Sequence, residues 1–333
     1  MLSFRHMFDV LKGARILVTG GAGFIGSHLV DRLLELGAGK VIVLDNLLTG
    51  RRENLAQHEG DARFVFIHGD ANHRQTLETV FLIHQPEYVF HLAALVGVKR
   101  VEEQPLEVLK DLDGLRGIFE LAHARGVKKI LFTSSSEAYG EPVSLPSAEH
   151  GPLNANPRDP YALVKLIGEN LCHHYWHKYG LPTVALRFFN VYGPRQESSG
   201  YGFVVGIFLD RVMKGQAPQI FGDGSATRAF VFYKDNVECI LRAMVKQETN
   251  GEAINIGKGE PTTIKELAET IIRMSGKGHL VPEYHPPRKL EIRYRSPDTA
   301  KQERLLGIRA TTPLDEGLRV TYAHLEEKTR VAA

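Results

Sequence analysis

Three glycines at three-residue spacing, Gly20, Gly23 and Gly26, follow directly on the apolar stretch 15–19. Each position has its own chemical use: the first glycine permits a tight turn, the second lets the backbone approach a pyrophosphate, and the third lets a helix pack closely on a strand. A helical pattern begins at 24, so the free N–H groups of a helix N-terminus would face the phosphates. The spacing therefore predicts a loop that binds the pyrophosphate of a dinucleotide.

An acidic residue, Asp45, ends the next apolar stretch at 40–45. A carboxylate at this place accepts a hydrogen bond from a ribose 2′-hydroxyl and repels a 2′-phosphate. The sequence therefore predicts NAD, and not NADP, as the cofactor.

A tyrosine and a lysine four positions apart, Tyr161 and Lys165, follow the pair Asp159-Pro160. Proline is favoured in the first turn of a helix, and side chains four apart share one helix face. A nearby ammonium and the positive nicotinamide of NAD would both lower the pKa of the tyrosine, which could then act as a general base. Upstream, a strand-like stretch ends in the serine run 134–136, so hydroxyl groups are expected at the same edge of the sheet. The two patterns support each other as parts of one catalytic site.

Apolar strands alternate with helical patterns through the first half of the chain. Strands are predicted at 15–19, 40–45, 63–67, 87–92, 128–133 and 182–187, and helices near 24–36, 73–83, 105–125 and 159–179. This alternation predicts an α/β fold with a doubly wound parallel sheet of the Rossmann type. We expect an NAD-binding domain over 1–187, to which segments near 230–257 return, and a smaller α/β substrate-binding lobe over 188–333.

Composition limits the class of protein. The chain has 333 residues, 43% of them hydrophobic, and a net charge of only +2, which gives no reason to expect nucleic-acid binding. Its two cysteines are too few for a disulfide framework or a zinc cluster, and we expect no metal. No apolar run reaches the length of a membrane span, and charged residues interrupt the apolar residues of the N-terminus, so neither an anchor nor a signal peptide is predicted. The expected location is cytoplasmic.

In these motifs the chain resembles an extended short-chain dehydrogenase/reductase, of the NAD-dependent branch that modifies nucleotide-diphosphate sugars. The resemblance covers nearly the whole sequence. Besides the patterns above, it rests on Gly69-Asp70, His91-Leu92-Ala93-Ala94, Arg187-Phe188-Phe189-Asn190-Val191-Tyr192-Gly193-Pro194 and Arg228-x-Phe230-Val231.

The resemblance implies roles for individual residues. The cofactor contacts would be Gly20, Gly23, Phe24, Ile25 and Gly26 on the pyrophosphate, Asp45 and Asn46 on the adenosine ribose, Asp70 at the adenine, and Leu92, Ala93 and Ala94 along the cofactor. Tyr161 would be the base, Lys165 would bind the nicotinamide ribose, and Ser136 would bind the same sugar hydroxyl as Tyr161. Asn190, Arg228 and Arg288 would bind the diphosphate of the substrate, for which a UDP-sugar is the leading prediction.

Oxidation at C4 of such a sugar gives a 4-keto intermediate, from which three reactions can follow: 4-epimerisation, loss of water, or decarboxylation of a uronate. Glu137 occupies a position where similar dehydratases and uronate decarboxylases commonly have a glutamate, and it could serve as a C5 base. Arg295, in Arg295-Ser296-Pro297-Asp298, resembles the Arg-x-Pro-Asp of uronate decarboxylases. Against both, Gly193-Pro194-Arg195-Gln196 and the tract 203–232 look more like an epimerase. A UDP-sugar 4-epimerase is therefore the leading prediction, with UDP-glucuronate decarboxylase or sugar-nucleotide dehydratase as the alternative.

Three further expectations concern the class of protein, the residue at position 111 and the oligomeric state. An NAD-binding sensor without turnover is the alternative from another class, and the intact Ser136, Tyr161 and Lys165 argue against it. Asp111 stands where the family usually has asparagine, which puts a hydrogen bond to the backbone near the cofactor in doubt. The resemblance also implies a homodimer, in which helices near 105–125 and 160–178 form a bundle between the subunits.

Overall fold

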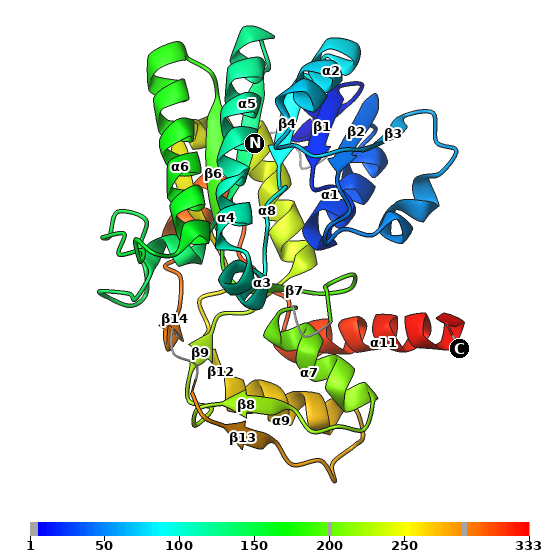
Figure 1. Ribbon diagram of the computed structural model, residues 1–333, viewed down its shortest axis with the longest axis vertical. Coiled ribbons are helices and arrows are strands. Elements are labelled where there is room, and N and C mark those ends of the chain that lie inside the picture. Colours follow the sequence, from blue (N-terminus) through cyan, green and yellow to red (C-terminus); the bar gives the residue numbers. More distant parts are fainter. Residues whose placement is uncertain (1–5, 199–201, 288–291, 333) are drawn as a thin grey trace.

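A seven-stranded parallel sheet with helices on both faces forms the larger part of the molecule (Figure 1). The computed structural model describes residues 6–198, 202–287 and 292–332. The strands of this sheet are β1 Arg15–Thr19, β2 Lys40–Asp45, β3 Phe64–His68, β4 Tyr88–His91, β5 Lys129–Ser135, β6 Thr183–Phe188 and β11 Glu252–Ile256. They lie in the order β11-β6-β5-β4-β1-β2-β3, and every neighbouring pair is parallel.

The strand order reverses between β1 and β4. From β1 the chain proceeds to β2 and β3 on one side, whereas β4, β5, β6 and β11 follow on the other. The loops that leave β1 and β4 therefore diverge at the carboxyl edge, and in doubly wound sheets the crevice between such loops binds the ligand.

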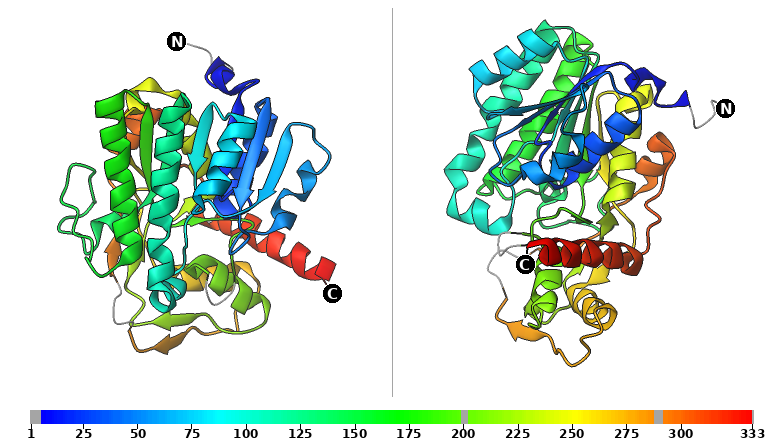
Figure 2. Two further views of the ribbon diagram at one scale, coloured as in Figure 1. Left: turned by 45° about the horizontal axis from the view of Figure 1, so that its top comes forward. Right: turned by 90° about the vertical axis from the view of Figure 1, so that its right-hand side faces the viewer.

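Both faces of the sheet are buried. Along β1, Ile16 and Val18 belong to one apolar core and Leu17 to the other, as the two-residue period of a strand requires. The first core packs against α1 Phe24–Glu35, α8 Tyr233–Val245 and α10 Ala300–Leu306. The second packs against α2 Arg74–His84, α5 Asp111–Ala124 and α6 Pro160–Tyr179, which lie together on one face in the left view of Figure 2.

A smaller lobe with its own core lies beyond the carboxyl edge of the sheet (Figure 1). Its helices are α7 Val204–Met213, α9 Ile264–Met274 and α11 Leu314–Ala332. Its short strands are β7 Val191–Tyr192, β8 Gln219–Phe221, β9 Thr227–Arg228, β10 Val231–Phe232, β12 Thr262–Thr263, β13 Glu283–His285 and β14 Tyr294–Arg295. They form the pairs β10-β7 and β13-β8 and the three-stranded sheet β12-β9-β14.

The predicted fold class is confirmed, and each predicted strand of the large sheet is present within one or two residues of its expected bounds. The expected helix over 105–125 is instead two helices, α4 Pro105–Leu109 and α5, preceded by α3 Val98–Glu103. At the break, Lys110 N donates to Glu107 O and Asp113 N to Lys110 O, so tighter three-residue bonds replace the regular helical ones. Within the described segments, no helix is both long enough and apolar enough to cross a membrane.

Candidate active site

The glycine loop lies at the point where the strand order reverses. Gly20 has φ +71°, and a Cβ there would lie 2.7 Å from the backbone nitrogen of Ala93. A Cβ at Gly26 would lie 2.2 Å from Gly20 O, inside any allowed contact. Gly20 and Gly26 thus lie so close to neighbouring backbone that only glycine fits there. Helix α1 begins directly after Gly23. This cradle fits a pyrophosphate, as the spacing predicts.

Asp45 and Asp70 lie at the ends of the next two strands, where the adenosine half of a dinucleotide is expected. The buried Asp45 carboxylate accepts hydrogen bonds from Ala22 N at 2.9 Å and Leu47 N at 2.8 Å. Burial raises the pKa of Asp45, and these two N–H groups oppose the rise. Asp45 therefore also fixes the glycine loop, a role that the sequence analysis did not foresee. Asn46 is exposed, and its side chain accepts a hydrogen bond from Leu48 N at 3.0 Å.

The segment after β4 carries the predicted cofactor-lining residues Leu92, Ala93 and Ala94. Leu92 N donates to Thr19 O at 3.1 Å, so the segment continues the pairing of β4 with β1. A Cβ at Gly20 would lie 2.7 Å from Ala93 N, so this segment lies directly against the glycine loop.

Tyr161 and Lys165 lie on α6, whose first turn is built as the sequence predicts. Asp159 caps the helix by accepting from Tyr161 N at 3.0 Å and Ala162 N at 3.2 Å, and Pro160 occupies the first turn. The buried Lys165 ammonium donates to Thr133 O at 2.8 Å and lies 5.3 Å from the centre of the Tyr161 ring. The helix and the end of β5 thus hold the two side chains on one face.

Burial governs the protonation of both groups. It lowers the pKa of Lys165 to about 8, with the Asp111 carboxylate opposing the change. Burial raises the pKa of Tyr161, and a hydrogen bond from Ser135 opposes that rise. We had expected the ammonium to lower the pKa of Tyr161. In the protein alone, desolvation of the phenol outweighs that effect.

The serine next to Tyr161 is Ser135, one position before the predicted Ser136. The Ser135 hydroxyl accepts from Glu137 N at 3.2 Å, and its interaction with Tyr161 opposes the rise in the pKa of the phenol. Both serines are buried, and Ser136 begins the 3₁₀ turn Ser136–Tyr139. The Ser134 hydroxyl donates to Glu169 farther along α6. The change from strand to 3₁₀ turn decides which hydroxyl lies beside Tyr161, and three consecutive serines give no sign of where it occurs.

Glu137 and Arg295 form a bidentate ion pair at the site. Arg295 Nη1 lies 2.5 Å from Glu137 Oε1, and Arg295 Nη2 lies 2.6 Å from Oε2. The side chains retain only 15% and 23% exposure, so the pair is largely shielded from water. It joins β14 of the smaller lobe to the end of β5. The sequence analysis identified both residues but did not predict that they are bound to each other.

Arg228, one of the three predicted diphosphate ligands, lies beside Arg295. The pairing of β9 with β14 puts these two residues in register. Asn190 Nδ2 is buried and, within the described segments, finds no hydrogen-bond partner. Such a donor suits a ligand oxygen. Arg288 lies outside the described residues.

Two residues of the stretch 193–196 make structural contacts. Arg195 pairs with Asp31 of α1 at 2.8 Å, and Gln196 Nε2 donates to Val191 O at 3.0 Å. The stretch 193–196, which we compared with epimerases, therefore joins the two lobes.

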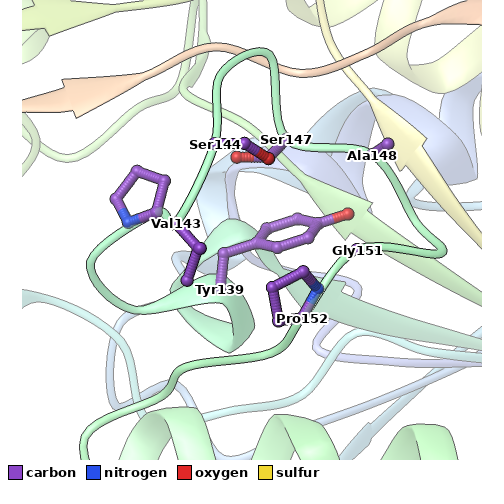
Figure 3. Close-up of a pocket in the computed structure, with 8 residues that line it drawn as sticks. Tyr139, Val143, Ser144, Ser147, Ala148, Gly151 and Pro152 are labelled. Carbon is purple, nitrogen blue, oxygen red and sulfur yellow. The ribbon is translucent and has the colours of Figure 1, made fainter.

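A buried network behind the site was not foreseen. Arg187 binds Glu169 of α6 at 2.7 Å and donates to the hydroxyl of Tyr139 at 2.8 Å, which in turn donates to Asn255. The Tyr139 ring lies under the loop that carries Val143, Ser147, Gly151 and Pro152 (Figure 3). This network fixes β5, β6, β11 and α6 relative to one another immediately below Ser135 and Glu137.

Comparison with known proteins agrees with this arrangement. The model of the NAD-dependent epimerase/dehydratase family matches residues 16–257. A UDP-glucose 4-epimerase from Mycolicibacterium smegmatis is 38% identical over 95% of this chain and 100% of its own length. A UDP-N-acetyl-alpha-D-glucosaminuronate decarboxylase from Bacillus cytotoxicus is 34% identical over 94% and 98% of the two chains. The crystal structure of UDP-glucose 4-epimerase from Thermotoga maritima with UDP-glucose superposes with a TM-score of 0.88, at 38% identity over 94% and 99% of the chains.

Proposed function

The chain belongs to the NAD-dependent epimerase/dehydratase family, and from this premise we propose that it is a UDP-sugar 4-epimerase. As a member, it is an enzyme that uses NAD to modify a nucleotide sugar. The finer proposal concerns which reaction follows oxidation at C4, and on which sugar.

The glycine loop, Asp45 and the segment after β4 would hold the cofactor. NAD, when bound, supplies a hydride acceptor and a positively charged ring beside the catalytic side chains. That charge would counteract the effect of burial on the pKa of Tyr161.

The side chains on α6 and at the end of β5 would handle the proton. Tyr161 would remove the proton of the C4 hydroxyl as the C4–H bond breaks, which leaves a ketone at C4. Ser135 would donate a hydrogen bond to the same oxygen, and Lys165 would keep a positive charge beside the phenolate. After the keto sugar turns over, the hydride held by the cofactor would return to C4 on its other face, and Tyr161 would return its proton to the C4 oxygen, which gives the other epimer.

The Glu137–Arg295 ion pair favours epimerisation over the two other reactions. Loss of water requires a base for the C5 proton, and both oxygens of the Glu137 carboxylate are already engaged by the Arg295 guanidinium. In the pair, Glu137 occupies the Arg295 guanidinium, which would otherwise bind a C6 carboxylate of the substrate. The Glu137 carboxylate therefore lies where that C6 carboxylate would bind. An enzyme that only moves hydride and the hydroxyl proton has no need of either free group. The pair therefore supports 4-epimerisation.

Decarboxylation of a UDP-uronate is the second candidate. Loss of carbon dioxide from a 4-keto uronate needs no base, and Arg295 could exchange Glu137 for the substrate carboxylate. The arginine stands in the Arg-x-Pro-Asp pattern, and a uronate decarboxylase is among the relatives of the chain.

Mass spectrometry of sugar nucleotides incubated with the protein tests this choice. The panel would contain UDP-glucose, UDP-N-acetylglucosamine, UDP-glucuronate and the GDP- and dTDP-hexoses. We expect a product of unchanged mass but different retention time from a UDP-hexose. A product lighter by carbon dioxide would establish the second candidate, and one lighter by water would refute both.

Tyr161→Phe separates the enzyme from a sensor that binds NAD without turnover. Removing the phenolic oxygen should lower kcat by roughly 10²- to 10⁴-fold, because the hydroxyl proton has no acceptor, and NAD should still bind. Turnover assays and calorimetric titration with NAD measure the two effects. An undiminished kcat in the variant would contradict the role given to Tyr161.

A further inference from the structure

Asp111 is a buried carboxylate at the first turn of α5 that joins two loops of the cofactor crevice. Asp111 is only 8% exposed. Oδ2 accepts from Leu95 N at 2.9 Å, and Oδ1 accepts from Asn72 Nδ2 at 3.0 Å. Leu95 directly follows the predicted cofactor-lining residues 92–94. Asn72 N in turn donates to Asp70 Oδ1 at 2.8 Å, at the predicted adenine end. One side chain thus fixes the loops after β3 and β4 to each other.

The hydrogen-bond pattern suits a carboxylate. Two N–H donors approach two different oxygens of the side chain, and an amide has only one oxygen. Asparagine at this position would keep the bond to Leu95 N, but it would bond Asn72 only if the Asn72 amide turned to present its oxygen. The backbone hydrogen bond that the sequence analysis left in doubt is therefore retained, and a second acceptor is added.

The charge of Asp111 acts on the catalytic side chains. Lys165 and Asp70 are the charged groups that affect the pKa of Asp111, which burial raises. Asp111 in turn favours the protonated form of Lys165 and of Tyr161. A buried ammonium needs a nearby negative charge more than an exposed one, because water does not screen it.

We propose that Asp111 is a positioning residue of the cofactor site, which ties the loop at 70–72 to the loop at 92–95 and supplies the negative charge that offsets the cationic end of the crevice. The proposal rests on the proposed function, since it assigns Asp111 to the same site. It concerns the binding of the cofactor, which can be measured without turnover.

The oxidised and reduced cofactors provide a test that responds to charge. The nicotinamide ring of NAD⁺ is positive, and that of NADH is neutral. If Asp111 stabilises a cation next to Lys165, Asp111→Asn should weaken NAD⁺ binding about five- to tenfold more than NADH binding. Calorimetric titration of the full-length protein with each cofactor gives the two dissociation constants and their ratio. Equal weakening of both, or no change, would overturn the charge role of Asp111.

Two further variants keep the test decisive. Asp113→Asn removes a carboxylate from an exposed position in the same helical turn and should leave the ratio unchanged. The double exchange Asp111→Asn with Asn72→Asp moves the charge to the other partner while both hydrogen bonds can form, and the ratio should return toward the wild-type value. A ratio that stays altered in the double variant would contradict the proposal, even if Asp111→Asn alone did not fold.

A failure of the proposed function can be distinguished from a failure of the role proposed for Asp111. A wild-type protein that binds NAD⁺ and NADH but converts no sugar nucleotide refutes the proposed reaction, and the ratio still tests Asp111.

Discussion

Lys165 is the catalytic side chain whose protonation changes within the pH range of an ordinary assay. Burial lowers its pKa to about 8, so the ammonium is intact below that pH and is lost as the pH rises through it. Because the charge stabilises the tyrosinate, we expect kcat/KM for the UDP-sugar to fall above about pH 8. In Lys165→Arg the side chain stays charged, since arginine keeps its proton above pH 12, and the fall should move to higher pH although the maximum is lower. Profiles of kcat/KM from pH 6 to 10 check this, and an identical fall in both proteins would assign it to another group.

At the scale of residues, the sequence identifies which residues take part in the site more reliably than it identifies the contacts between them. Tyr161, Lys165 and Pro160 follow from helical spacing and from the preference of proline for a first turn, which are local. The choice between Ser135 and Ser136 depends on where a strand becomes a 3₁₀ turn. The Glu137–Arg295 pair joins residues from different lobes, and no local pattern could predict that pairing.

Among the elements, the turn from β1 to α1 offers a sharp test. Helix propensity and packing predict opposite effects of a Gly→Ala exchange on the free energy of unfolding. In an ordinary helix Gly→Ala is stabilising, by up to about 1 kcal/mol. At Gly26 the added Cβ would lie 2.2 Å from Gly20 O, so Gly26→Ala should lower the free energy of unfolding by about 1–3 kcal/mol and weaken NAD binding. Urea denaturation and calorimetry measure the two effects. Gly278→Ala, at a position with open space around it, should change neither by much. Unaltered NAD affinity in Gly26→Ala would contradict the role of the loop.

The elements themselves are largely predictable because each strand is an apolar run and each helix has a regular apolar face. The break at Lys110 is not, because it accompanies the contacts of Asp111 with Leu95 and Asn72 from other loops. The short strands of the smaller lobe were likewise not predicted singly. Two or three residues, as in β9 Thr227–Arg228, give no measurable periodicity.

For the whole molecule, the two lobes meet in polar contacts around α1. His28 lies 3.0 Å from Pro194 O, and Arg195 binds Asp31. Together with the Glu137–Arg295 pair, these contacts hold the substrate-side residues over the carboxyl edge of the sheet. The sequence predicts that a second lobe exists, whereas its orientation depends on these long-range pairs.

The association of the whole chain can be tested on the outer face of α4 and α6. These packed helices leave Leu106 74% exposed and Ile167 41% exposed, which suits a surface covered by a second copy of the chain. We expect a homodimer in sedimentation velocity, and Ile167→Asp should raise its dissociation constant by about tenfold or more, because a carboxylate would be buried without a partner. Val320→Asp, at a 40% exposed apolar position on α11, is the matched control and should leave association unchanged. If the wild-type protein sediments as a monomer, or if both variants weaken the dimer equally, this face of α4 and α6 is not the interface.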